Sequence, residues 1–396
     1  MRKAVQKTAA TFERRLGGDQ ERKWIRMLAL GAGGSRSRVC FMRSGMRCLA
    51  LGCLLAMGMA GSAAVFKQPA TAGNQMLLPQ MPLHDPYILA YAPTKTYYLY
   101  TSNVPSLTQM RRIGTMVYAS QDLKHWTVPK VVFTVLEGFW AEQGGWALEV
   151  HAYKGRFYLL TTLHNDKKTL PQELPLGHET YMRGTIIAVS DSPDGPFVPM
   201  KSDGPIPPAN FMTVDGTLYV DRAGKPWMVY AHEWLQVTDG KMEAVPLKDD
   251  LTAAAGDPIS LFKASDAPWI NEQALPTTAG ARYVTDGPEL YRTKDGHLLM
   301  LWSSYEQLND KVPGSHYLQT VARSESGELK GPWVQLAPLV RQDSGHGMLF
   351  RTFDGQLMMV LHRPFRGARG KLYEMRDGGD HLEVVRERWD LDGDNR

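Results

Sequence analysis

The chain contains 396 residues, with 45 lysine and arginine, 41 aspartate and glutamate and 3 cysteine residues, and a formal net charge of +4. The first 64 residues hold 12 of the basic and 3 of the acidic residues, so residues 65–396 carry a formal charge of −5. All three cysteines also lie in residues 1–64. The remainder therefore lacks the basic surplus of a nucleic-acid-binding domain, and disulfides and thiolate metal sites are excluded from it.

Residues 1–64 have the order of features of a secretory signal peptide. A basic region is followed by an apolar run over residues 49–59 and by the small residues Gly61-Ser62-Ala63-Ala64. The apolar run is too short to span a bilayer. We expect a basic leader and signal peptide that is removed or disordered, a secreted or periplasmic mature protein, and no membrane association after leader removal. The alternative is that residues 1–64 are retained as an amphipathic anchor.

From residue 65 onward the chain repeats a pair of short strands. The second strands of the pairs begin at intervals of 60, 70, 71 and 59 residues, at Tyr97, Phe157, Trp227, Leu298 and Leu357. A fixed period of β-hairpins is typical of radial repeats, and five such units predict an all-β, five-bladed β-propeller over residues 65–396. We expect its blades near residues 65–130, 131–205, 206–270, 271–340 and 341–396. The alternative, a β-sandwich with coincidental spacing, does not require the same strand order five times.

The first strand of each pair begins near a polar residue. In chain order these residues are Asp85, Glu149, Asp215, Asp286 and His346. The innermost strands of a propeller converge on one axis. The sequence therefore predicts that four carboxylates and one imidazole meet around a central channel.

Five short motifs around these strand starts resemble glycoside hydrolase family 43, which contains five-bladed propeller enzymes acting on arabinose- and xylose-containing glycans. The motifs occur in the family's order and span essentially all of residues 65–396; they are His84-Asp85-Pro86, Trp146-Ala147-Leu148-Glu149-Val150, Asp215-Gly216-Thr217-Leu218, Asp286-Gly287-Pro288 and Gly345-His346-Gly347. The resemblance implies an inverting glycosidase. Such a reaction needs two carboxyl groups roughly 6.5–9.5 Å apart, so that a water molecule fits beside the anomeric carbon.

The resemblance also implies a role for each carboxylate. Asp85 matches the family's general base, and Asp215 matches the residue that orients the acid and raises its pKa. Asp286 occupies the position of the general acid, where the family usually has the longer glutamate. Because of this departure, Glu149 and Glu289 stay open as alternative acids.

Further residues are candidates for binding the sugar or an ion. Those expected to contact substrate are Trp146, Glu149, Glu233, Trp234 and Trp302. His346 resembles the family's axial histidine, which lies near a calcium ion or a water cluster. Calcium prefers about six to eight oxygen ligands, so a lone imidazole predicts a largely hydrated calcium ion. No cofactor is expected to be required for the chemistry.

These observations together predict a carbohydrate-active hydrolase. We expect it to release arabinofuranose or xylose units from plant-type polysaccharides or oligosaccharides, as an α-L-arabinofuranosidase or β-xylosidase. The alternative is a propeller that binds glycans without cleaving them, which the replacement of glutamate by Asp286 keeps open. A related enzyme that uses phosphate is disfavoured, since basic residues are not clustered at the strand starts.

Overall fold

The computed structural model describes residues 75–173, 180–270, 283–307 and 315–392. The predicted leader, residues 1–64, lies outside the described residues. Among the residues that are described, no helix is long and apolar enough to cross a membrane. Residues 72–396 form one compact unit, whose described elements are nearly all β-strands.

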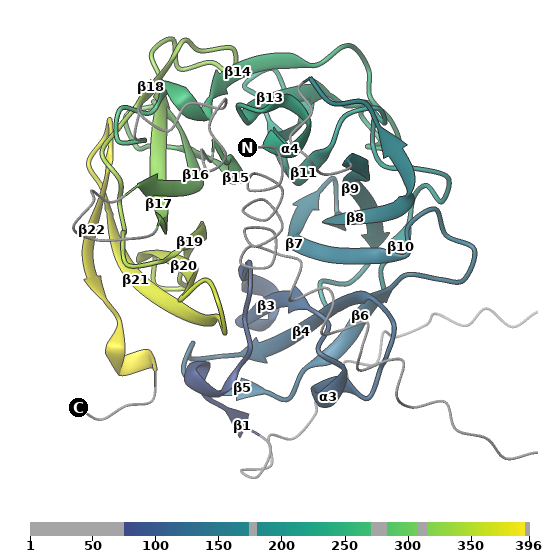
Figure 1. Cartoon of the computed structure of the whole chain (residues 1–396). Coiled ribbons are helices and arrows are strands. Elements are labelled where there is room, and N and C mark those ends of the chain that lie inside the picture. Colours follow the sequence, from purple (N-terminus) through teal and green to yellow (C-terminus); the bar gives the residue numbers. More distant parts are fainter. Residues whose placement is uncertain (1–74, 174–179, 271–282, 308–314, 393–396) are drawn as a thin grey trace, which may run out of the picture. The chain divides into compact units, whose positions relative to one another are not determined.

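The strands form consecutive antiparallel blades (Figure 1). The first blade contains β2 (Tyr87–Tyr91), β3 (Thr96–Ser102), β4 (Gly114–Ser120) and β6 (Lys130–Thr134). The second contains β7 (Gln143–Tyr153), β8 (Arg156–Leu170), β9 (Thr180–Ser190) and β10 (Val198–Pro199). The third contains β11 (Thr213–Val220), β12 (Pro226–His232), β13 (Lys241–Pro246) and β14 (Ile259–Lys263). A parallel bridge between Gly184 and Thr213 joins the second and third blades.

The last two blades repeat the same order. The fourth contains β15 (Asp286–Arg292), β16 (Leu298–Gln307), β17 (Ser315–Ser324) and β18 (Trp333–Gln335). The fifth contains β19 (Gly345–Arg351), β20 (Leu357–Arg363), β21 (Arg369–Asp377) and β22 (Leu382–Glu387). Each innermost strand contacts the innermost strand of the next blade, and β19 contacts β2, which closes the ring. The predicted all-β, five-bladed β-propeller is confirmed.

Short elements connect or flank the blades. The strand β1 (Gln75–Met76) pairs with β5 (Trp126–Thr127). The single-turn helices are α3 (Pro105–Thr108), α4 (Trp234–Val237), η1 (Leu78–Gln80), η2 (Ala92–Thr94), η3 (Ala264–Asp266) and η4 (Trp389–Leu391). Of these, α4 matters for function, because it follows β12 directly and positions Glu233 and Trp234.

The core lies between the faces of neighbouring blades. Along β16, Met300 and Trp302 pack against the third blade, whereas Leu299 and Leu301 pack against the fifth. This alternation follows from the two-residue period of a strand, and a strand covered on both faces is apolar throughout. Each buried leucine or methionine contributes roughly 1.5–3 kcal/mol relative to exposure.

Trp302 belongs to this core and not to a sugar-binding surface. Its side chain is fully buried (0% exposed), and its ring packs against Phe262 and Trp269 at centroid distances of 5.3 and 5.5 Å. Its indole N–H donates to Gln335 Oε1 at 3.0 Å. The prediction that Trp302 contacts substrate is therefore wrong.

A left-handed residue lies shortly before, or in the first half of, each innermost strand. The residue and its φ angle are, in blade order, Asp85 (49°), Ala147 (46°), Asp215 (57°), Gly287 (53°) and His346 (52°). In the second to fifth blades a β-bulge shifts the register at this point. A left-handed conformation costs a non-glycine residue of order 1–3 kcal/mol and persists only where the surroundings hold it. Four non-glycine residues in this costly conformation, Asp85, Ala147, Asp215 and His346, thus belong to the innermost strands of four blades or lie shortly before them.

Candidate active site

Three of the five left-handed residues bring charged or titratable side chains together. His346 Nδ1 lies 3.3 Å from Asp85 Oδ1 and 3.9 Å from Asp215 Oδ2. The fourth left-handed residue, Gly287, leaves room for this imidazole, because a Cβ atom there would lie 3.0 Å from the His346 ring. The predicted convergence of Asp85, Asp215 and His346 is thus observed in the structure.

Side chains of the preceding blade hold the strained backbone in place. The amide of Asp215 donates to Thr162 Oγ1 at 2.8 Å, and the amide of His346 donates to Ser303 Oγ at 2.8 Å. At the seam between the fifth and first blades, the amide of Asp85 donates to His362 Nδ1 at 3.3 Å. Because these bonds repeat from blade to blade, we infer that they stabilise the left-handed conformation.

Backbone amides of the following blade orient the two carboxylates. Ala147 N–H donates to Asp85 Oδ2 at 3.3 Å, and Gly287 N–H donates to Asp215 Oδ2 at 3.1 Å. In both cases the donor is itself a left-handed residue. The orientation of each carboxylate is therefore fixed by the packing of two blades rather than by a flexible loop.

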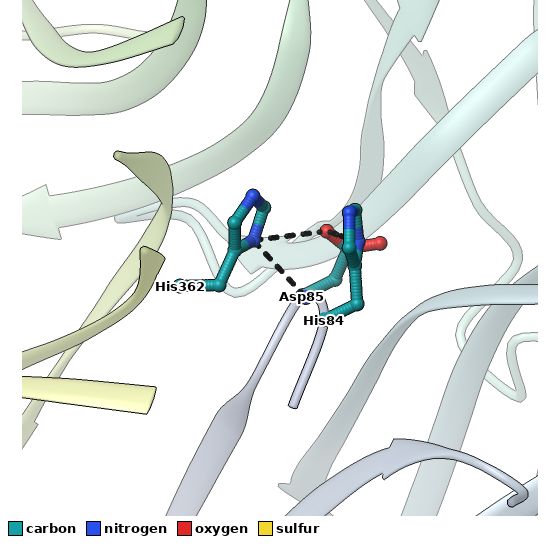
Figure 2. Close-up of side chains that lie close together, drawn as sticks. All are labelled: His84, Asp85 and His362. Atoms are coloured by element: carbon teal, nitrogen blue, oxygen red, sulfur yellow. Dashed lines mark hydrogen bonds and ion pairs between the residues drawn. The ribbon is translucent and has the colours of Figure 1, made fainter. Parts of the chain in front are cut away.

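The other oxygen of Asp85 is surrounded by imidazoles. Figure 2 shows the rings of His84 and His362 beside the Asp85 carboxylate. The Nδ1 atom of His84 lies 2.8 Å from Asp85 Oδ1, and that of His362 lies 3.4 Å from it. Burial alone would raise the pKa of Asp85, but His346 and His84 outweigh it and hold the pKa well below its ordinary value. Asp85 is therefore ionised at neutral pH.

His362 acts as a neutral hydrogen-bond acceptor. It is fully buried, and burial lowers its pKa well below the ordinary value for histidine. Its Nδ1 lone pair accepts the Asp85 amide, in the way that the hydroxyls of Thr162 and Ser303 act in other blades. The contact of His362 with Asp85 Oδ1 is consequently not an ion pair.

A cluster of possible metal ligands lies beside Asp85, but it does not include His346, the residue at which a calcium ion is predicted. Among the described residues, His84, Asp85 and His362 are the group whose possible ligand atoms lie within 4.8 Å of one another. They offer two nitrogens and one carboxylate oxygen, whereas calcium takes about six to eight oxygens. The rings of His84 and His362 are also stacked, with centroids 4.2 Å apart and planes 27° apart. A hydrated calcium ion at His346 stays a prediction, and no catalytic step is assigned to it.

Asp286 directly precedes the left-handed Gly287 and has the opposite electrostatics to Asp85. Burial, followed by the negative charges of Asp215 and Glu233, raises the pKa of Asp286 well above its ordinary value. The hydroxyl of Tyr317 donates to Asp286 Oδ2 at 3.1 Å. These surroundings favour the protonated form of Asp286.

Asp215 lies between these extremes. Burial raises its pKa to about 6, with His346 opposing the rise and Asp85 adding to it. The charges of Asp85 and Asp215 in turn contribute to the raised pKa of Asp286. The three carboxyl groups thus form one electrostatic unit, as expected for groups with divided acid and base roles.

Glu149 and Glu289 lie one level farther along the innermost strands. Each stands two residues after the left-handed residue of its blade, as Tyr87 does in the first blade. Glu149 Oε2 lies 2.7 Å from His151 Nε2, and Glu289 Oε2 accepts the Leu349 amide at 2.7 Å. Burial and the charge of Glu149 raise the pKa of Glu289 well above its ordinary value.

The sequence therefore misplaced one of the four expected carboxylates. The second-blade residue equivalent to Asp85 is Ala147, because a bulge separates Trp146 from Glu149. Glu149 instead lines a small cavity in the channel, whose other lining residues include Asp85, Tyr87, His346 and Met348. In the described part of the chain, no hydrogen bond links Glu149 or Glu289 to Asp215 or Asp286, and both stay open as alternative acids.

Two of the remaining predicted substrate residues, Trp146 and Glu233, contact an arginine that the sequence analysis did not single out. Arg183 Nη1 lies 3.0 Å from Glu233 Oε2, and its guanidinium lies 5.2 Å from the Trp146 ring and 5.1 Å from the Tyr181 ring. Trp146, Glu233 and Trp234 are each partly exposed, so their predicted contact with sugar stays open. Arg183, Tyr317 and His362 had no motif that could have revealed them.

Comparison with known proteins identifies relatives of this chain. The chain is 26% identical over 176 residues to the extracellular endo-α-(1→5)-L-arabinanase 1 of Bacillus subtilis, a match covering 42% of this chain and 48% of the relative. The chain thus matches about half the length of that curated relative.

Solved structures extend the similarity to the whole propeller. An endo-arabinase from Bacteroides thetaiotaomicron is 36% identical, with a TM-score of 0.65, and the match covers 76% of this chain and 97% of that one. An endo-1,4-β-xylanase from the same organism is 20% identical, with a TM-score of 0.57 and coverage of 77% and 95%, which shows the fold alone. The profile of glycosyl hydrolases family 43 matches residues 79–393, and the chain therefore belongs to that family of glycoside hydrolases.

Proposed function

We propose that the protein is an inverting glycosidase in which Asp85 is the general base, Asp286 the general acid and Asp215 the residue that tunes the acid. One observation carries this proposal: Asp85 and Asp215 converge on His346 next to Asp286, in surroundings that lower the pKa of Asp85 and raise that of Asp286. A base must be ionised and an acid protonated at the working pH, and active sites achieve this by pushing two pKa values apart.

In the proposed reaction, Asp85 accepts a proton from a water molecule as the water oxygen attacks the anomeric carbon. The bond between that carbon and the glycosidic oxygen breaks, and Asp286 donates its proton to the departing oxygen. The products are a sugar of inverted configuration and a free hydroxyl on the leaving group. Transfer of a proton from Asp85 to Asp286 through solvent restores the starting state.

We propose arabinofuranose or xylose units of plant-type polysaccharides or oligosaccharides as the substrate, of the α-L-arabinofuranosidase or β-xylosidase type. The 36% identity to a protein named as an endo-arabinase favours arabinose-containing chains. Incubation with arabinan, arabino-oligosaccharides, xylan and aryl glycosides of both pentoses tests this choice. Proton NMR of the first product should show the inverted anomer, and a retained anomer would refute the proposed mechanism.

A glycan-binding propeller without catalysis is the second candidate. It is favoured by the short contact between Asp85 Oδ1 and His84 Nδ1, since an ion-paired carboxylate is a weaker base. The same glycans distinguish the two functions. Binding in calorimetry with no product after prolonged incubation would support the second candidate over the first.

We also propose that the protein is exported. The leader over residues 1–64 supports this, and the Bacillus subtilis relative is named as extracellular. Mass spectrometry of the protein from a culture fractionated into cytoplasm, periplasm and medium tests it. Export predicts a chain that begins after Ala64 outside the cytoplasm, and a full-length cytoplasmic chain would contradict it.

A further inference from the structure

We propose that Tyr317 positions the proton donor, by holding Asp286 Oδ2 so that the other oxygen, Oδ1, carries the proton toward the glycosidic oxygen. This inference rests on the proposed role of Asp286 as the general acid. The aspartate at position 286 is one methylene shorter than the glutamate that the family usually has there. Orientation of the shorter side chain is the task that we assign to Tyr317. Tyr317 is a positioning residue here, and Asp286 is the group that touches the reacting atoms.

Tyr317 reaches Asp286 from within the same blade. It lies on β17, whereas Asp286 begins β15, and β16 runs between the two strands. Ser303 on β16 pairs with Asp286, and two residues farther along Tyr305 pairs with Tyr317. The tyrosine ring therefore passes over the middle strand, and its hydroxyl lies 3.1 Å from Asp286 Oδ2.

The ring of Tyr317 is held on several sides. Its side chain is 1% exposed, and it lies parallel to the His362 ring, with planes 7° and centroids 5.6 Å apart. Phe365 packs edge-on at 5.1 Å. Gly345 lies directly against the ring, because a Cβ atom there would come within 2.4 Å of it. This explains why a glycine precedes His346 and shows that the hydroxyl has little freedom to move.

The hydrogen bond favours one oxygen of Asp286 as the site of the proton. A protonated carboxyl has one O–H group and one carbonyl oxygen, and the carbonyl oxygen is the stronger acceptor for the Tyr317 hydroxyl. Since Oδ2 accepts, the proton is placed on Oδ1. After proton transfer the same bond stabilises the carboxylate that forms, which favours departure of the leaving group.

The test is the dependence of Tyr317→Phe on the leaving group. We compare kcat/KM for an arabinosyl or xylosyl disaccharide, whose leaving group needs protonation, with the corresponding 2,4-dinitrophenyl glycoside, which does not. The variant should lose about 10- to 100-fold on the disaccharide and less than about 3-fold on the dinitrophenyl glycoside, since acid assistance contributes up to about 10²–10⁴-fold. The alkaline limb of its pH profile should move to higher pH, because the Tyr317 hydrogen bond lowers the pKa of Asp286.

The matched control is Tyr118→Phe. Tyr118 is also fully buried, and within the described residues its hydroxyl has no hydrogen-bond partner. It lies on β4 of the first blade, so removing its hydroxyl changes neither the leaving-group ratio nor the pH profile. A loss with Tyr317→Phe that is equal on both substrates, or absent on both, would overturn the proposal.

Two further variants keep the outcomes separable. Gly345→Ala displaces the tyrosine ring without removing the hydroxyl, and the ratio of its activities on the two substrates should change as in Tyr317→Phe. Because the added Cβ also crowds Ser303 Oγ, a loss that is equal on both substrates is assigned to Ser303 and His346. Asp286→Asn tests the acid itself. If Asp286→Asn shows no leaving-group dependence, the proposed function fails at that residue. If Asp286→Asn shows it and the other two variants do not, only the role of Tyr317 fails.

Discussion

Two levels of the propeller channel contain ionisable groups, and their surroundings differ. At the upper level, Asp85 and Asp215 accept hydrogen bonds from left-handed backbone amides and share His346. At the lower level, Glu149 is paired with His151 and Glu289 with the backbone of Leu349. A shift of two positions along the strand therefore changes the surroundings of a carboxylate. At the upper level it accepts hydrogen bonds from left-handed amides of the next blade, and at the lower level it does not.

The largest expected effect separates the two levels directly. Asp85→Asn should reduce kcat by at least about 1,000-fold, because the amide accepts no proton from water. Glu149→Gln should retain activity within about 10-fold, because it lies at the lower level. Steady-state hydrolysis of arabino-oligosaccharides measures both, with circular dichroism to confirm folding. If Glu149→Gln were inactive and Asp85→Asn active, the catalytic carboxylate would belong to the lower level and the proposed role of Asp85 would be wrong.

The second prediction concerns coupling within the upper level. In Asp215→Asn a negative charge that raises the pKa of Asp286 is lost, so that pKa falls. The alkaline limb of the pH–rate profile should then move to lower pH, and kcat should drop about 10- to 100-fold. The shift is opposite in sign to that expected for Tyr317→Phe. An unchanged alkaline limb would show that Asp215 does not act by raising the pKa of Asp286.

The third prediction tests the support beneath the upper level. Asparagine at position 362 retains an acceptor for the Asp85 amide, whereas leucine of similar size does not. His362→Leu should be about 1–3 kcal/mol less stable than His362→Asn, the usual cost of an unsatisfied buried amide. Urea denaturation measures this difference, and kcat should fall more in the leucine variant. Equal stability would mean that the left-handed conformation of Asp85 does not depend on His362.

The sequence predicted the arrangement of the blades around this site because the spacing of the hairpins recurs along the whole of residues 65–396. Five strand pairs at a nearly constant interval specify blades, and residues beginning the innermost strands must then converge, as Asp85, Asp215 and His346 do. The level of Glu149 was not predictable in this way. A bulge between Trp146 and Glu149 changes the register, and one shifted residue moves a side chain to another face or level.

Side chains that support the site were harder still to predict. Trp302 and Tyr317 are both aromatic residues on blade strands, yet one fills the core and the other reaches Asp286. Their difference depends on which face of the strand meets the neighbouring blade and on space left by Gly345. Neither quantity is encoded in a local pattern.

The smallest expected effect belongs to the lower level and is one of stability. Burial raises the pKa of Glu289 above its unfolded value of 4.5, so the folded state binds its proton more tightly. The stabilisation is fully present below pH 4.5 and is lost as the pH rises toward the folded-state pKa. Glu289→Gln removes this dependence. Its Tm should therefore fall less between pH 4.5 and 7 than that of the wild type, as scanning calorimetry can measure. A wild-type slope in Glu289→Gln would assign the pH dependence to other groups, whereas a flattened slope with activity retained would identify the lower level as structural.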